Sequence, residues 1–274
     1  MNSNTFLFIV CIIIGIICAV FFIDKTAYTR IPKKIWTFWD GPSQGIDLYL
    51  KNWAKWNPDY EIVVLTRKNY KGYVTIPERI KTHPNFHDTA TRFSELVRVW
   101  TLAEHGGVWI NLGLMNAPLT TWLFSKYAEF AGYEHNGILL PSFFACNKGC
   151  IFMQKWRDEF STMIDYDNVE EYTKNRMSSI SNLVSNPIQN PIQNAIQVAS
   201  IIALDQLPDR ESLIIQNAEN GPYQYLVKAK WDSEKALRMV CQNSAYGTPL
   251  ILLREQERRI VEQIPGLCRD YSYK

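Results

Sequence analysis

The chain has 274 residues, of which 47% are hydrophobic and 20% charged, so it can bury a substantial core. This composition excludes an intrinsically disordered protein. With 29 basic and 27 acidic side chains, the formal net charge is only +2, which excludes general electrostatic attraction to nucleic acid, so we expect no nucleic-acid partner.

The N-terminal region contains an uncharged apolar stretch, residues 6–23, with the sequence FLFIVCIIIGIICAVFFI. A stretch of this length can just cross a bilayer as a helix, so we predict a single-pass membrane anchor in residues 1–24 and a globular domain in residues 25–274. A cleaved signal peptide is the alternative, but no Lys or Arg precedes the apolar stretch. The basic residues that follow it favour a cytoplasmic domain, whereas many anchored enzymes of the secretory pathway face the lumen, so the side of the membrane stays open.

The cysteines and histidines show no spacing typical of a zinc site. Four cysteines lie beyond the apolar stretch, and we expect them to be buried free thiols: Cys146, Cys150, Cys241 and Cys268. A bridge between Cys241 and Cys268 stays open if the domain faces an oxidising compartment. Structural roles are expected for His83, His87, His105 and His135.

The first half of the globular domain begins with a strand, a helix and a second strand. Residues 33–39 form the expected first strand, which ends at the turn signal Asp40-Gly41-Pro42. A helix from residue 47 ends at Asn57-Pro58, and the continuous apolar centre of residues 60–66 predicts a strand covered on both faces. This order predicts a parallel βαβ unit and an α/β fold.

A longer helix is predicted over residues 90–105, because apolar residues recur on one side of it. Gly106 is placed to cap the helix, Gly107 frees the backbone to turn, and residues 108–110 form a short buried strand. Asn111 then falls at the carboxyl end of that strand. Ligands of open α/β sheets collect at such ends, so we expect Asn111 to face a crevice.

The second half of the domain shows further elements of both kinds. Residues 139–149 predict a strand, and residues 150–163 predict an amphipathic helix. The tetrapeptide echo in residues 186–197 predicts a turn that leads into a helix over 195–207. Residues 254–264 predict a charged surface helix.

Four segments together resemble one protein family: IPKKIWTFWDGP, FSELVRVWTLAEHGGVWIN, SFFACNKGCIFMQKWRDEF and AENGPYQYL. They look like the capsular polysaccharide synthesis family of glycosyltransferases, which is related to the DXD-containing sugar-binding glycosyltransferases. The resemblance spans roughly residues 31–235. It implies a GT-A fold, which is a Rossmann-like nucleotide-diphospho-sugar transferase domain. It also implies a nucleotide-sugar donor, a glycan or lipid-linked acceptor, and Mn²⁺ or Mg²⁺ as cofactor.

The resemblance assigns roles to individual residues. The family's helix-to-strand segment reads Ser-Asp, Arg, Tyr-Gly-Gly and then an Asp-containing metal motif. The matching positions here are Ser94-Glu95, Arg98, His105-Gly106-Gly107 and Asn111-Leu112-Gly113. The resemblance therefore implies that Ser94, Glu95 and Arg98 position the donor. It places Asn111 and Gly113 at the catalytic centre, with Asn111 at the metal position.

Further residues enter the predicted donor site through the same resemblance. It places Trp36 and Trp39 near the nucleotide base, Gly106 and Gly107 beside the donor, and Gly221 and Pro222 near its phosphates. Each position also has a structural interpretation. The tryptophans can fill the core, the glycines and Pro222 can simply form turns, and Glu95 with Arg98 can form an exposed ion pair.

Two departures from the family pattern leave three hypotheses for function. Glu95 keeps the negative charge of the usual Asp, but Asn111 offers only a neutral carbonyl oxygen and Gly113 offers no side chain. The first hypothesis is a membrane-anchored glycosyltransferase. The second is a weakened or inactive pseudoenzyme that binds a glycan, a nucleotide sugar or a partner enzyme. The third is a structural membrane-tethered protein.

Overall fold

The computed structural model describes residues 31–87, 89–123, 128–180, 188, 190–192, 194–241 and 248–263. All of these residues belong to the compact unit that starts at Ile31. Within these ranges no helix is long and apolar enough to cross a membrane. The predicted span at residues 6–23 and the second cysteine of the Cys241 to Cys268 bridge lie outside the described residues, so both stay predictions.

A central sheet contains six of the described strands, in the order β2-β1-β3-β6-β5-β7. These strands are β1 (Lys34–Phe38), β2 (Glu61–Leu65), β3 (Gly107–Ile110), β5 (Phe130–His135), β6 (Ile138–Cys146) and β7 (Leu213–Asn217). β1 runs parallel to β2 and β3, and β5 runs parallel to β7, whereas β6 is antiparallel to both of its neighbours. The sheet is mixed and rich in parallel pairs, which confirms the α/β class.

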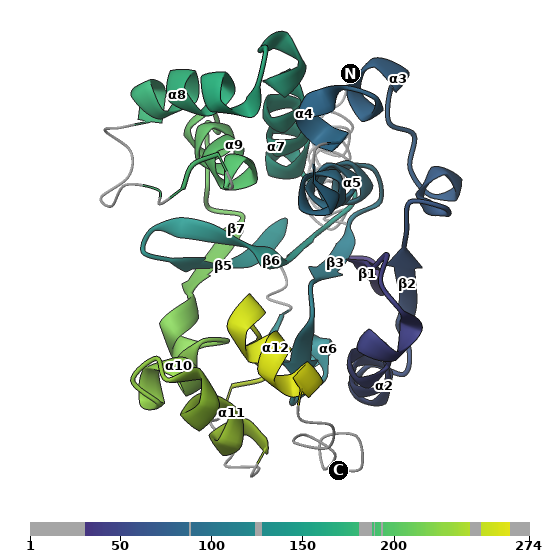
Figure 1. The fold of residues 1–274 in the computed structure, drawn as a ribbon, viewed down its shortest axis with the longest axis vertical. Coiled ribbons are helices and arrows are strands. Elements are labelled where there is room, and N and C mark those ends of the chain that lie inside the picture. The colour runs from purple at the N-terminus through teal and green to yellow at the C-terminus, as the bar shows by residue number, and fades with distance from the viewer. Residues whose placement is uncertain are drawn as a thin grey trace, which may run out of the picture. The chain divides into compact units, whose positions relative to one another are not determined.

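Helices cover both faces of this sheet (Figure 1). On the upper face in that view lie α3 (Glu78–Lys81), α4 (Pro84–His87), α5 (Ala90–His105), α7 (Ile151–Ser161), α8 (Val169–Ile180) and α9 (Ala195–Asp205). On the lower face lie α2 (Asp47–Trp56), α6 (Leu119–Trp122), α10 (Gln224–Lys228), α11 (Ser233–Cys241) and α12 (Glu255–Gln263). Each face of the sheet has its own hydrophobic cluster, since Trp36 packs in one and its chain neighbour Ile35 in the other.

The predicted βαβ unit is confirmed, because β1, α2 and β2 follow one another and the two strands pair in parallel. The predicted helix over residues 90–105 also has the expected bounds. The side chain of Thr89 caps its first turn by accepting a hydrogen bond from the Arg92 amide at 3.0 Å. Gly106 ends the helix at φ 65° and ψ −161°, a conformation that essentially only glycine adopts.

A small second sheet lies directly after the strand that ends at Asn111. Its strands β4 (Gly113–Met115) and β8 (Leu250–Leu252) pair in antiparallel fashion. Two side chains of α2 fix β4: the Trp53 indole donates to the Gly113 carbonyl at 2.7 Å, and Asn52 exchanges hydrogen bonds of 2.7 and 3.0 Å with the Met115 backbone. The backbone that follows Asn111 is therefore held by both β8 and α2.

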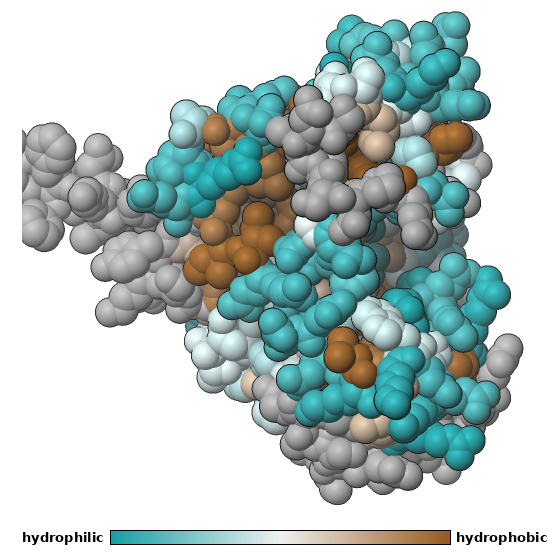
Figure 2. All heavy atoms as spheres, turned by 90° about the vertical axis from the view of Figure 1, so that its left-hand side faces the viewer, coloured by the Kyte–Doolittle hydropathy of each residue, from teal (hydrophilic) through white to brown (hydrophobic). Residues whose placement is uncertain are grey.

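The last strand in the sheet order, β7, forms one lateral side of the central sheet and carries partly exposed aliphatic side chains. β7 pairs only with β5 among the described strands, and its residues Leu213, Ile214 and Ile215 are half-buried. Figure 2 views the side of the molecule that lies at the left of Figure 1, and it shows hydrophobic side chains gathered in one area with hydrophilic side chains around it.

Candidate functional site

The carboxyl ends of three neighbouring parallel strands bring polar residues to one edge of the sheet. Arg67 follows β2, Trp39 and Asp40 follow β1, and Asn111 follows β3. Trp36 of β1 pairs with Trp109 of β3, so these two strands reach this edge within a few residues of the same register position. In α/β proteins this edge is where ligands collect, and it is our candidate site.

Asn111 is held by hydrogen bonds to both its backbone and its side chain. Its amide nitrogen donates to the Ser142 carbonyl of β6 at 2.8 Å. Its side-chain oxygen Oδ1 accepts from the Trp109 indole Nε1 at 2.9 Å and from Arg98 Nη2 at 3.4 Å. Asn111 is half-buried. Asn111 is thus fixed by three hydrogen bonds while the residue as a whole keeps intermediate exposure.

A buried cluster of charged side chains on α5 lies beneath Asn111. Arg98 also donates to the Pro141 carbonyl, and its guanidinium carbon lies 5.1 Å from the centre of the Trp109 ring. Glu95 pairs with Arg92 at 3.4 Å. Two guanidinium groups face one carboxylate in this cluster, so it carries a net positive charge beside the sheet edge.

Burial shifts the acid–base properties of this cluster. Loss of solvent raises the pKa of Glu95 to about 7, although Arg98 and Arg92 oppose the rise. Burial also lowers the pKa of Arg98 to about 10, which Glu95 opposes. Both residues are at least 95% buried, so the alternative of an exposed ion pair is wrong. Among the described residues, Glu95 Oε2 and Arg98 Nε have no hydrogen-bond partner.

Trp39, Asp40 and Arg67 form the other half of the edge. The Arg67 amide donates to Asp40 Oδ1 at 2.8 Å, and the Arg67 side chain pairs with the same carboxylate at 3.4 Å. The half-buried Trp39 ring lies over its own loop, with Nε1 donating to the Pro42 carbonyl at 2.8 Å. Asp40 is therefore already neutralised by a cation, while Trp39 keeps part of its surface accessible.

Three of the predicted donor-binding residues have structural roles. Trp36 is only 1% exposed, and its indole donates to the Gly106 carbonyl at 3.0 Å, so it belongs to the core. A side chain at Gly106 would place its Cβ 2.6 Å from the Lys148 amide nitrogen. A Cβ at Gly107 would lie 2.8 Å from the Lys34 carbonyl oxygen. The close approach of neighbouring backbone requires both glycines, whatever the ligand.

Gly113, Gly221 and Pro222 are buried positions whose described contacts are also structural. Gly113 lies in β4, where an added Cβ would meet the Ile251 carbonyl oxygen at 2.9 Å. An added Cβ at Gly221 would lie 2.9 Å from the Tyr133 ring. The Pro222 carbonyl accepts a hydrogen bond from the Leu252 amide at 3.3 Å. No described hydrogen bond joins these three residues to Asn111.

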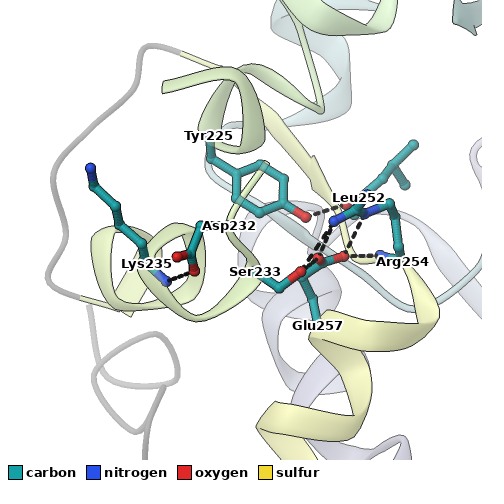
Figure 3. A network of polar contacts seen from close by, with 7 residues as sticks. All are labelled: Tyr225, Asp232, Ser233, Lys235, Leu252, Arg254 and Glu257. Atoms are coloured by element: carbon teal, nitrogen blue, oxygen red, sulfur yellow. Dashed lines mark hydrogen bonds and ion pairs between the residues drawn. The ribbon is translucent and has the colours of Figure 1, made fainter. Parts of the chain in front are cut away.

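A polar network shown in Figure 3 holds β8, and through β8 the backbone beside Asn111. The Tyr225 hydroxyl donates to the Leu252 carbonyl at 2.8 Å. Next to it, the fully buried Glu257 accepts from Arg254 Nη2 at 2.6 Å, from Arg254 Nε at 3.0 Å and from the Ser233 hydroxyl. These hydrogen bonds lower the pKa of Glu257 despite its burial. The network joins α10, α11 and α12 to the small sheet.

The residues at the edge do not fit the divalent cation that the resemblance implies. Both hydrogen bonds to Asn111 Oδ1 come from groups that only donate, so the oxygen is committed to the protein. The nearby Arg98 repels a cation, and the Asp40 carboxylate is engaged by Arg67. In the part of the chain that is described, no group of three or more His, Cys, Asp or Glu residues could hold a metal.

Ser94, the cysteines and two overlooked residues remain to be placed. Ser94 is half-buried on α5, with no described hydrogen bond from its side chain. The two cysteines that the structure describes in full, Cys146 and Cys150, are buried free thiols as expected.

Sequence reasoning overlooked Arg67 and Trp109 as site residues. Arg67 could have been found, because it follows a predicted strand at the ligand edge.

The fold and the site define a mixed α/β protein with a cationic edge at the ends of three parallel strands. The sequence pattern described as "Capsular polysaccharide synthesis protein" matches residues 15–172, and the chain belongs to this family, which confirms the resemblance. Among solved structures, it is similar to the PaToxG glycosyltransferase, with a TM-score of 0.38 and 16% identity over 66% of this chain and 82% of that chain. No curated protein matches.

Proposed function

We propose that the chain is a glycosyltransferase of the GT-A type. It transfers a sugar from a nucleotide-sugar donor to a glycan or lipid-linked acceptor, anchored in a membrane by residues 6–23. The observation that carries the proposal is Asn111 at the carboxyl end of β3, hydrogen-bonded to Arg98 of the cationic α5 cluster, in a member of a capsular polysaccharide synthesis family.

The charges of this edge suit a diphosphate group. The α5 cluster supplies buried positive charge, which acts strongly because little water screens it. Arg67 adds a more exposed guanidinium, whose charge is balanced by the Asp40 carboxylate, so the net positive charge comes from the α5 cluster. Transfer from a nucleoside-diphosphate sugar releases a nucleoside diphosphate, so cations placed near this leaving group lower the barrier by electrostatic stabilisation. Trp39 offers a partly accessible ring for the base, whereas Trp36 does not.

A donor panel tests the proposal. The full chain in mild detergent is incubated with UDP-, GDP-, TDP- and CMP-linked sugars, and release of the free nucleotide is measured with and without a glycan acceptor mixture. We expect turnover of at least one donor. Asn111→Ala should lower that turnover about tenfold or more, because a hydrogen bond to a charged group is lost. No turnover and no binding with any donor would refute the proposal.

A pseudoenzyme is the second candidate, and one observation favours it. The residue at the metal position is neutral, and its oxygen is engaged by Trp109 and Arg98. A pseudoenzyme would bind a donor in the panel at the same edge without releasing the nucleotide. Binding without turnover across all donors and acceptors would therefore replace the first candidate with the second.

A further inference from the structure

The orientation of the Asn111 amide determines what this residue can offer a ligand. An asparagine side chain has one accepting oxygen and one donating NH₂ group, Nδ2. The Trp109 indole and the Arg98 guanidinium can only donate, so the atom that faces them must be the oxygen. Nδ2 then points away from both groups, and no described residue accepts a hydrogen bond from it.

This orientation makes the strand end a hydrogen-bond donor toward a ligand, where a carboxylate would be an acceptor. A carboxylate at this position would present a free negative oxygen, which suits a metal ion. The half-buried Asn111 instead presents two N–H bonds, above a cluster with net positive charge. Such a position attracts an acceptor atom that carries negative charge, and it repels a cation.

We propose that Asn111 Nδ2 donates directly to a phosphate oxygen of the nucleotide-sugar donor, and that the chain holds the diphosphate without a divalent cation. This inference rests on the proposed function and deepens it. Arg98 acts as a positioning residue, because it fixes the amide orientation and supplies charge from below. The donor is therefore recognised by fixed protein groups alone.

Calorimetry on the full chain in mild detergent tests the inference, with UDP, GDP, ADP and TDP as probes. Each probe is titrated in EDTA and again in Mn²⁺. We expect at least one nucleoside diphosphate to bind in EDTA, with a Kd within about twofold of its value in Mn²⁺. This comparison uses only the wild-type chain, so it does not depend on the folding of any variant. Binding that requires Mn²⁺ overturns the inference and leaves the proposed function standing.

The variant Asn111→Asp tests the role of the amide itself. The carboxylate keeps an oxygen for Trp109 and Arg98 and turns its second oxygen outward, where it repels phosphate. We expect affinity in EDTA to fall about tenfold to a hundredfold, and Mn²⁺ to restore much of it. An unchanged affinity of this variant in EDTA overturns the inference.

Asn175→Asp is the matched control. Asn175 lies on α8, and its Oδ1 accepts a hydrogen bond from the Tyr166 hydroxyl at 3.2 Å, which a carboxylate can also do. This variant makes the same charge change away from the edge and should bind as wild type does. If no nucleoside diphosphate binds under either condition, and no nucleotide sugar is bound or turned over, the inference and the proposed function both fail.

Discussion

Replacing Gly106 by alanine tests whether this glycine is required by the fold or by a ligand. At φ 65° and ψ −161° an alanine is strained, at a cost of about 1–3 kcal/mol. Its Cβ would also lie 2.6 Å from the Lys148 nitrogen and 2.7 Å from the Asn147 carbonyl carbon. Both are backbone atoms that cannot rotate away, which adds a further cost of about 1–3 kcal/mol. We therefore expect a total loss of about 2–6 kcal/mol in the free energy of unfolding.

Two other glycines separate the backbone strain from the steric overlap. Gly137 has φ 78° with open space around it, so Gly137→Ala should cost only the strain, about 1–2 kcal/mol. Gly72 has open space and no positive φ, so Gly72→Ala should change stability by less than about 0.5 kcal/mol. Urea unfolding followed by tryptophan fluorescence measures all three variants. If Gly106→Ala costs no more than Gly137→Ala, the packing argument is wrong.

Two further predictions concern buried carboxylates. The folded chain holds the Glu95 proton up to about pH 7, whereas the unfolded chain releases it near 4.5, so stability should fall as the pH rises between these values. The loss is at most about 3 kcal/mol, and a Glu95→Gln variant should lack that part of the pH profile when unfolding is measured from pH 4 to 8. Glu257→Gln should lower the free energy of unfolding by about 2–4 kcal/mol, because it breaks a buried pair with the partly exposed Arg254. Its control, Glu255→Gln, breaks an exposed pair on the same helix and should leave the urea midpoint unchanged; equal effects of the two variants would contradict the burial argument.

Local signals explain which elements could be predicted from the sequence. The helix over residues 90–105 was predictable because its apolar period and its capping glycine lie within a few residues of one another. The hairpin between β5 and β6 was also within reach, since Asn136-Gly137, both with positive φ, is a strong hairpin signal. That signal was overlooked.

Long-range contacts explain what was beyond sequence reasoning. β4 has only three residues, and its partner β8 lies more than 130 residues further along the chain, so no local pattern joins them. The buried polar side of α5 is similar, because periodicity assigns Glu95 and Arg98 to a polar face. Their burial depends on β6, whose Pro141 carbonyl accepts from Arg98. The pairing of Asn111 with Arg98 follows from that tertiary packing and not from spacing.

Hydrogen exchange of the full chain tests the central claim, that the ends of β1, β2 and β3 hold the donor. Backbone amide exchange is compared with and without a saturating nucleoside diphosphate. We predict slower exchange in residues 39–41, 66–68 and 109–111, and unchanged exchange in α12. Protection confined to other parts of the chain, or absent at saturation, would contradict the account.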